Sequence, residues 1–241
     1  MEQTGGYLPF SVTPDEARAQ LQKWLATLGW FRPSDLSTTA RVQELKPLWW
    51  VAWVFDADAI VSWAADSNHG SRRSAWAPHA GTATVVFDDI LASASRGLAA
   101  SEVDVLTKGY DLYSARPNPQ GADGATIEQF DVQRSHARKQ VAQALEQMAR
   151  QRVQQNEIPG TKFRKLQVSL VLQNLVTRRL SFPAYVMAYR YKGQLYRLVI
   201  SGQDKTLLTG NAPYSQAKIA IVTLGVVGLL AIIVVLIGIA Q

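Results

Sequence analysis

Two segments of the chain carry apolar residues at helical spacing. The first begins at Thr13, which suits a helix cap, and continues with Pro14 at the first helical position and Glu16 where it closes a capping box. Leucine and tryptophan then recur every three or four residues until Gly29. This pattern predicts a helix over residues 14–28, followed by a turn with aromatic anchors at Trp30 and Phe31.

The second helical segment is longer and basic. It is predicted over 135–155 and is followed by Pro159-Gly160, which cannot continue a helix. Its expected apolar stripe consists of Ala137, Val141, Ala144, Leu145 and Met148.

The remaining periodic segments favour β-structure. Residues 48–55 are rich in aromatic and β-branched side chains and predict a strand, which continues or pairs with a second strand over 59–65. An exposed loop is expected over 66–78 and short helical turns over 88–113. Further strands are predicted at 82–87, 166–176, 184–191, 194–201 and 206–208.

Residues 219–240 contain no charge, and Thr223 is their only polar side chain. As a helix this run would extend about 33 Å at about 1.5 Å per residue, enough for a hydrocarbon core of about 30 Å. We therefore expect an α+β fold: a β-rich cytoplasmic domain with an N-terminal helix and a long basic helix, followed by one C-terminal transmembrane helix.

The topology expected from these signals is that of a tail-anchored, single-pass membrane protein. Residues 1–12 resemble no signal peptide, and Lys218 stands just before the apolar run with no basic residue after it. These features place the N-terminal domain in the cytoplasm. The absence of cysteine fits a reducing compartment and excludes disulfides and thiolate chemistry.

Charge divides the chain into two halves. Residues 1–133 carry a net charge of −6 and residues 134–241 a net charge of +12. We therefore expect an acidic, tryptophan-rich α+β lobe over 1–133 and a basic lobe, helix plus antiparallel sheet, over 134–215. The basic lobe either meets anionic lipid or packs against the acidic lobe; no recognition motif indicates nucleic acid.

These considerations select a set of candidate contact residues for a membrane surface or a protein partner. Five tryptophans fall between positions 49 and 76, and because Trp49 and Trp50 are adjacent in a strand, they should face opposite sides, leaving one available for contact. The candidates are Trp49, Trp50, Arg138, Lys139, Arg150, Arg152, Lys162, Arg164, Lys165 and Lys218.

Little in the sequence indicates catalysis. His69 and His79 share a polar loop but lack the spacing of a metal site. Asp56 with Asp58, or Asp88 with Asp89, could hold a cation in a hydrolase, although solvated strand ends explain the same residues. No phosphate-binding glycine loop is present. We predict no catalytic residues, no metal, no cofactor and no small-molecule substrate.

Three stretches together resemble a known family. They are Leu8-Pro9-Phe10 with the capped helix and Trp24, the segment 50–56, and a C-terminal series from Phe182-Pro183 through Tyr189-Arg190-Tyr191 to Ala212-Pro213-Tyr214-Ser215. They resemble bacterial membrane proteins of the TFIIB-type zinc-ribbon or primosomal-protein-N′-like kind, and the last hairpin resembles a PepSY unit. Without cysteine the zinc ribbon of that family is missing here.

The resemblance implies association with SPFH (flotillin-like) membrane proteins and no enzymatic work. The leading functional hypothesis is thus a tail-anchored scaffold or adaptor that acts through protein–protein interaction and contacts the lipid bilayer. Two alternatives stay open at this point: a regulator that binds anionic lipid, and a carboxylate- or metal-dependent hydrolase.

Overall fold

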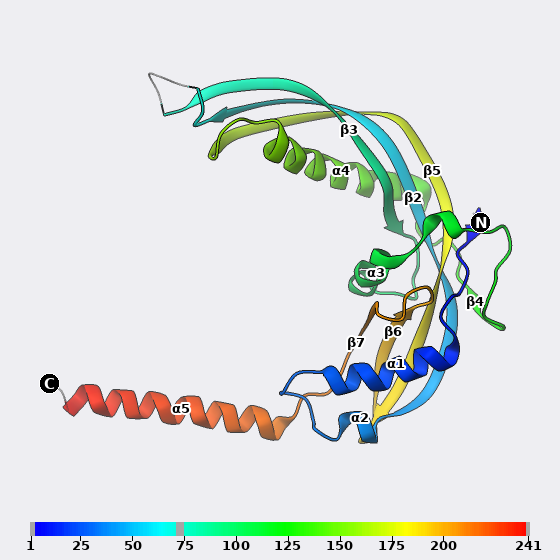
Figure 1. The fold of residues 1–241 in the computed structure, drawn as a ribbon, viewed down its shortest axis with the longest axis vertical. Helices are drawn as coiled ribbons and strands as arrows, with labels where there is room; N and C mark the ends of the chain where they lie inside the picture. Colours follow the sequence, from blue (N-terminus) through cyan, green and yellow to red (C-terminus); the bar gives the residue numbers. More distant parts are fainter. Residues whose placement is uncertain (1–2, 71–74, 240–241) are drawn as a thin grey trace.

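The protein is a sheet-rich α+β fold built on one seven-stranded sheet. The computed structural model describes residues 3–70 and 75–239. Figure 1 shows the sheet as a strongly curved band, with helices on its inner side and one helix projecting from its end. The elements are β1 (Gly6–Tyr7), α1 (Pro14–Thr27), α2 (Leu36–Thr39), β2 (Arg41–Ser67), β3 (Ala77–Ser93), α3 (Ala100–Leu106), two 3₁₀ turns (Thr107–Gly109 and Leu112–Ser114), β4 (Thr126–Ile127), α4 (Arg134–Asn156), β5 (Phe163–Tyr191), β6 (Gln194–Ser201), β7 (Leu208–Gly210) and α5 (Gln216–Ile239).

Two long strands, β2 and β5, form the centre of the sheet. The order is β3-β2-β5-β6-β7, all antiparallel, while β1 and β4 add short parallel pairings to β5 and β2. Strands from both predicted lobes therefore share this sheet. Of the two alternatives for residues 48–65, continuation is confirmed, because β2 runs unbroken. The separate strands expected at 166–176 and 184–191 are likewise one strand, β5, which passes through Pro183.

The sheet bends where β2 reaches Asp56. At this level both neighbours of β2 carry extra residues: the register shifts between Phe55 and Ala57 against β3, and between Asp56 and Asp58 against β5. Asp89 and Asn174, on the two outer strands, adopt positive φ angles of 57° and 47°. Bulges of this kind bend and twist a sheet without breaking it.

An ion cluster holds the three strands together at the bend. The Arg178 guanidinium donates two hydrogen bonds of 3.1 Å to the Asp56 carboxylate and one of 2.5 Å to Asp89, whose backbone N–H donates to Asp56. Burial lowers the pKa of Arg178, but its hydrogen bonds to Asp56 and Asp89 outweigh that effect and raise the pKa overall. Arg178 therefore stays charged and joins β2, β3 and β5 at the bulges.

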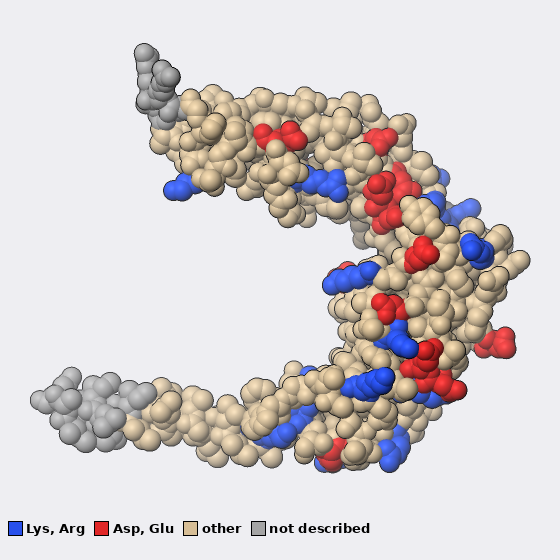
Figure 2. Space-filling view, viewed as in Figure 1, with Lys and Arg blue, Asp and Glu red and all other residues tan. Residues whose placement is uncertain are grey.

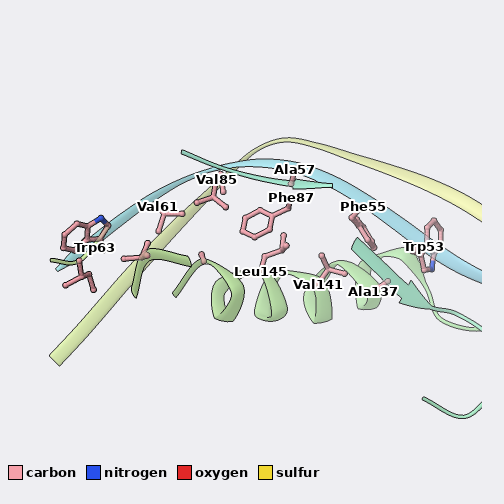
Figure 3. Packing of buried hydrophobic residues seen from close by; sticks show 14 of the residues in the cluster. Trp53, Phe55, Ala57, Val61, Trp63, Val85, Phe87, Ala137, Val141 and Leu145 are labelled. Atoms are coloured by element: carbon pink, nitrogen blue, oxygen red, sulfur yellow. The ribbon is translucent and has the colours of Figure 1, made fainter. Parts of the chain in front are cut away.

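Beyond the bend lies the arm, which we define as the three-stranded part formed by 57–67 of β2, 77–87 of β3 and 163–173 of β5. Alternate residues of β2, from Phe55 to Ala65, face α4 and are buried with Phe87 of β3 (Figure 3). Helix α4 meets them with residues spaced four apart: Ala137, Val141, Leu145, Ala149 and Val153. The predicted apolar stripe was wrong at Ala144, which is exposed. Four residues make slightly more than one turn of an α-helix, so the line of buried residues moves around the helix and leaves Ala144 outside it.

The base, which comprises the rest of the sheet, is covered on both faces. Trp49 points to a core completed by α1, and Trp50 to an opposite core completed by α3. Helix α1 has the predicted capping box, in which Thr13 and Glu16 bond each other's backbone N–H groups. Short helical turns form after β3 as expected, but β3 itself extends to Ser93.

The expectation for the C-terminal segment requires a correction. Within residues 3–70 and 75–239, no helix is long and apolar enough to cross a membrane. The prediction rested on the apolar letters of 219–240 alone, and the described part of α5 does not meet that requirement. The predicted transmembrane helix is therefore wrong, and the tail-anchored, single-pass localisation with a cytoplasmic N-terminal domain is contradicted with it.

The packing alternative for the two charged halves is confirmed by their ion pairs. Besides the bend cluster, Arg164 lies 3.0 Å from Asp66, Arg197 2.9 Å from Glu102, and Lys205 2.8 Å from Glu16. Each joins a base from the second half to an acid from the first. Much of the opposite charge in the two halves is thus compensated inside one fold.

Replacing Asp56 with alanine tests the bend. We expect a loss of about 1–3 kcal/mol in the free energy of unfolding, because the substitution leaves Arg178 without its two-point partner. Urea denaturation measures this. Asp15→Ala, which breaks an exposed pair with Arg18 within one helix turn, should cost less than about 0.5 kcal/mol; equal effects of the two substitutions would contradict a structural role for the bend cluster.

Glu16 gives the protein a specific response to acid. The hydrogen bond from Lys205, followed by those from Thr13, lowers the pKa of Glu16 from 4.5 to about 2. A lowered folded-state pKa contributes stability that is complete above about pH 4.5 and is lost as the pH falls toward about 2. In acid titrations followed by circular dichroism, wild-type stability should fall more steeply across this window than that of Glu16→Gln. Parallel profiles would refute the linkage.

Candidate partner-binding surface

Helix α5 leaves the body of the protein with its apolar side chains uncovered. From Ile219 to Ile232, the large apolar residues described have exposed fractions between 38% and 72%. They lie on every side of the helix, so no single face packs against the sheet. Figure 1 shows α5 extending away from the base, and Figure 2 shows that its described part carries charge only near its start.

The start of α5 is held firmly by the loop between α1 and α2. The Ser215 N–H donates a 2.8 Å hydrogen bond to the Phe31 carbonyl, and Lys218 Nζ donates one of 2.9 Å to the Arg32 carbonyl. The Arg32 guanidinium stacks 3.7 Å from the centre of the Tyr214 ring and bonds the Ala212 carbonyl. Sequence-distant segments therefore fix the direction in which α5 leaves.

A buried tyrosine secures the segment just before α5. The Tyr189 hydroxyl donates a 2.6 Å hydrogen bond to the Asn211 carbonyl, and the Asn211 N–H bonds the Arg197 carbonyl at 2.9 Å. Burial raises the pKa of Tyr189, so this hydroxyl stays protonated and donates at any physiological pH. The connection from β7 to α5 is thus attached to the core and to an edge of the sheet.

Three exposed aromatic residues surround this point, and we call them the collar: Trp30, Phe31 and Tyr214, with exposed fractions of 56%, 46% and 61%. The Trp30 and Phe31 rings meet edge to face at 5.4 Å, and Lys218 Nζ lies 5.4 Å from the Trp30 ring centre. The collar therefore lies at the start of α5, close to the exposed apolar residues that begin at Ile219. Exposed apolar side chains gathered in this way are typical of interaction sites.

Two glycines open one side of α5. A Cβ atom placed on Gly225 or on Gly228 would meet nothing within 4 Å. Residues three apart lie on the same side of a helix, so the two positions form one shallow notch between larger side chains. Small residues at such positions let another helix backbone approach closely.

The structure separates the contact residues chosen from the sequence. Trp49 and Trp50 face opposite sides, as the alternation required, but their exposed fractions are 3% and 0%, so neither offers surface to a partner or a headgroup. Their indole N–H groups bond the Leu8 carbonyl and the Tyr110 hydroxyl. Lys218 alone among the predicted contacts lies at the base of α5, next to the collar.

The basic candidates of α4 and β5 lie on the arm, and several are already engaged. Arg150 and Arg152 donate 2.7 Å hydrogen bonds to the backbone carbonyls of Leu166 and Val86, on opposite outer strands. Arg164 and Lys165 share Asp66, at 3.0 Å and 3.7 Å. Arg138 lines an open pocket of about 630 Å³ at the start of α4, and Lys139 and Lys162 are exposed.

The residues considered for catalysis take structural positions. Asp56 and Asp89 converge on Arg178, while Asp58 accepts a 3.2 Å hydrogen bond from Asn174. His79 Nε2 lies 3.1 Å from the His69 carbonyl oxygen, so this ring contacts the backbone of His69. Among the residues described, no cluster of three or more His, Asp or Glu could hold a metal ion.

Comparisons with known proteins add nothing to this picture: no protein-family model, curated protein or solved structure matches the chain. The resemblance drawn from the sequence therefore stays an expectation. Sequence reasoning had marked Trp30 and Phe31 only as turn anchors. It had no signal for their contact with Tyr214, because about 180 residues separate the two segments.

Arg32→Ala should loosen the start of α5. Losing one cation–π contact and one charged hydrogen bond to a carbonyl is worth about 1–2 kcal/mol, so the Ser215 amide should exchange its hydrogen about 5–30 times faster. Hydrogen exchange read by mass spectrometry or NMR measures this. Arg18→Ala, whose arginine pairs within α1, is the control, and unchanged exchange at Ser215 in Arg32→Ala would contradict the described attachment.

Proposed function

We propose that this protein is a non-enzymatic adaptor, and that α5 with its collar docks into an apolar groove between helices of a partner protein. One observation carries the proposal: a long helix, whose large apolar side chains are exposed on all sides over the part described from Ile219 to Ile232, is fixed at its start to a folded body. A helix that is apolar all round needs to be covered. Fixing its direction reduces the entropy lost on docking.

The two open glycines favour a partner helix as the neighbour of α5. Close backbone approach is useful only against a surface of definite shape, and the notch at Gly225 and Gly228 offers such a shape. The spacing of three does not form a small-xxx-small motif, which argues for a different chain as partner. Burying a leucine-sized side chain contributes about 1.5–3 kcal/mol, so a few contacts along α5 offset the cost of association.

The charged groups support an adaptor better than the two alternatives. Three of the four carboxylates that a hydrolase would use, those of Asp56, Asp58 and Asp89, are bonded to Arg178 or Asn174. Three of the basic side chains that anionic lipid would attract, Arg150, Arg152 and Arg164, bond groups within the fold. An SPFH-type membrane protein, which the sequence resemblance implies, is the partner class we propose to examine first.

The test compares chains that differ only in the shape of α5. Tagged full-length protein is purified from cells with and without cross-linking, and the partner recovered at constant ratio by the wild type is identified. Gly225→Leu with Gly228→Leu should reduce its recovery at least tenfold, because added side chains fill the notch. Val226→Leu with Val227→Leu adds bulk elsewhere on the helix and should leave recovery near the wild-type level.

Two results would overturn the proposal. Equal recovery by both double variants would mean that the glycine notch is not a contact. Equal binding of the wild type and the glycine double variant to protein-free phosphatidylcholine vesicles, together with no partner at constant ratio, would mean that the apolar surface of α5 is covered without a partner helix.

A further inference from the structure

The outer edge of β3 is a second surface, independent of α5. Among the strands described, β3 pairs with β2 alone. Its residues Ala77 to Phe87 pair in unbroken register with Ser67 to Ala57, which leaves a straight, unpaired edge of roughly 35 Å at about 3.3 Å per residue. An unpaired edge presents backbone N–H and C=O groups that can bond another strand.

The opposite edge of the arm is not equivalent. There β5 carries Lys165 and Asn174 with φ angles of 54° and 47°, at register shifts against β2. Arg150 also covers the Leu166 carbonyl. Bulges and positive charge are the usual means by which proteins keep edge strands from pairing, and the β5 edge has both.

Among its own residues, β3 lacks these protections over its middle part, although Arg152 of α4 donates a hydrogen bond to the Val86 carbonyl there, as Arg150 does to Leu166. From Ala80 to Phe87 the sequence Ala-Gly-Thr-Ala-Thr-Val-Val-Phe contains no charge and no proline, and none of its non-glycine residues has a positive φ. Pro78 precedes this stretch and Asp88-Asp89 follows it. Thr82, Thr84 and Val86 are exposed on the side away from α4. Within β3 itself, the proline and the charged residues are thus confined to the two ends of the stretch, and the Val86 carbonyl keeps a second lone pair for a pairing strand beside Arg152.

A groove runs beside the same stretch. It has a volume of about 260 Å³ between β3 and α4, with the apolar Ala83, Val85 and Val153 and the polar Arg152, Asn156 and Glu157 among its lining residues. A strand added to β3 would direct every second side chain toward this groove. The edge therefore offers backbone partners and a place for side chains together.

We propose that the occupant of this edge is β3 of a second copy of the chain, paired antiparallel across a two-fold axis at Thr84. This register places Thr84 opposite its own copy, Ala83 opposite Val85, and Thr82 opposite Val86. His79 then lies opposite Asp89, and no like charges face each other. The two arms join into one continuous sheet with both α4 helices on the same face.

A second copy is favoured as the occupant because the two pairing strands then have the same sequence and the same uncharged stretch. Two-fold pairing makes the same patch serve both partners, and it removes both unpaired edges at once. The uncharged stretch is centred on the groove residues, so the axis at Thr84 brings both grooves to the middle of the interface. The dimer uses no part of α5, which stays available for the partner proposed above.

The absence of cysteine in the chain makes a direct test possible. Thr84→Cys in the full chain should form a covalent dimer with a short bifunctional thiol cross-linker, because the two Cβ atoms would lie about 4.5–5.5 Å apart, somewhat wider than an unstrained disulfide. Ser62→Cys, on the neighbouring strand β2 and equally exposed, should stay monomeric on the same non-reducing gel. Equal cross-linking of both variants, or of neither, would overturn the proposed axis.

Charge substitution tests the same axis without cross-linking. In sedimentation velocity, Thr84→Lys and Thr84→Glu should each raise the dimer dissociation constant at least tenfold, since like charges would meet on the axis. Mixing the two should restore a dimer, which also shows that both variants are folded. Failure of the mixture to associate would refute the pairing. Gly225→Leu with Gly228→Leu should leave this dimer intact, so a failure at α5 and a failure at β3 are distinguishable.

Discussion

The antiparallel pairing of β2 with β5 is the constraint on which the rest of this structure depends. The two strands pair along nearly their whole lengths, from Arg41 against Arg190 to Ser67 against Phe163. A pair this long cannot stay flat, because twist accumulates with length. The curvature is concentrated at Asp56, where the bulges of both neighbouring strands relieve the strain and Arg178 joins the strands again.

The bend creates the arm, and the arm requires α4. Without a covering helix, the three strands would expose an apolar face to water, which is unfavourable. Helix α4 covers this face with Leu145 and Val153. The same helix sends Arg150 and Arg152 to carbonyls on the two outer strands. The basic helix that the sequence suggested as a lipid contact is therefore first of all the inner layer of the arm.

Local signals in the sequence predicted local structure well. The capping box at Thr13 and the strand at 194–201 form as expected, because their causes lie within a few residues. Prediction failed where the cause is distant. Two separate strands were predicted at 166–176 and 184–191, yet β5 is continuous through Pro183. There β2 pairs on both sides, and the Pro183 carbonyl accepts hydrogen bonds from Tyr110 and Gly202.

The candidate sites show the same limit. Adjacent tryptophans in a strand do face opposite sides, but only the packing of α1 and α3 on the two faces decides that both Trp49 and Trp50 are buried. Neither the collar nor the β3 edge could be read from the sequence. Tyr214 lies far along the chain from Trp30. Whether a strand lies at the edge of a sheet depends on which other strands pair with it in the folded protein.

The charges explain why recognition is assigned to uncharged surfaces. The acidic and basic halves meet in ion pairs in the arm, at the bend and around the base. Part of the charge that could steer a partner is thus matched within the fold, and partly exposed pairs of this kind contribute little to stability. The two proposed recognition surfaces, the side chains of α5 from Ile219 to Ile232 and the edge of β3 from Ala80 to Phe87, have no charged residues of their own. Because these surfaces lie on different parts of the curved sheet, one copy can engage a second copy through the arm while α5 engages another protein.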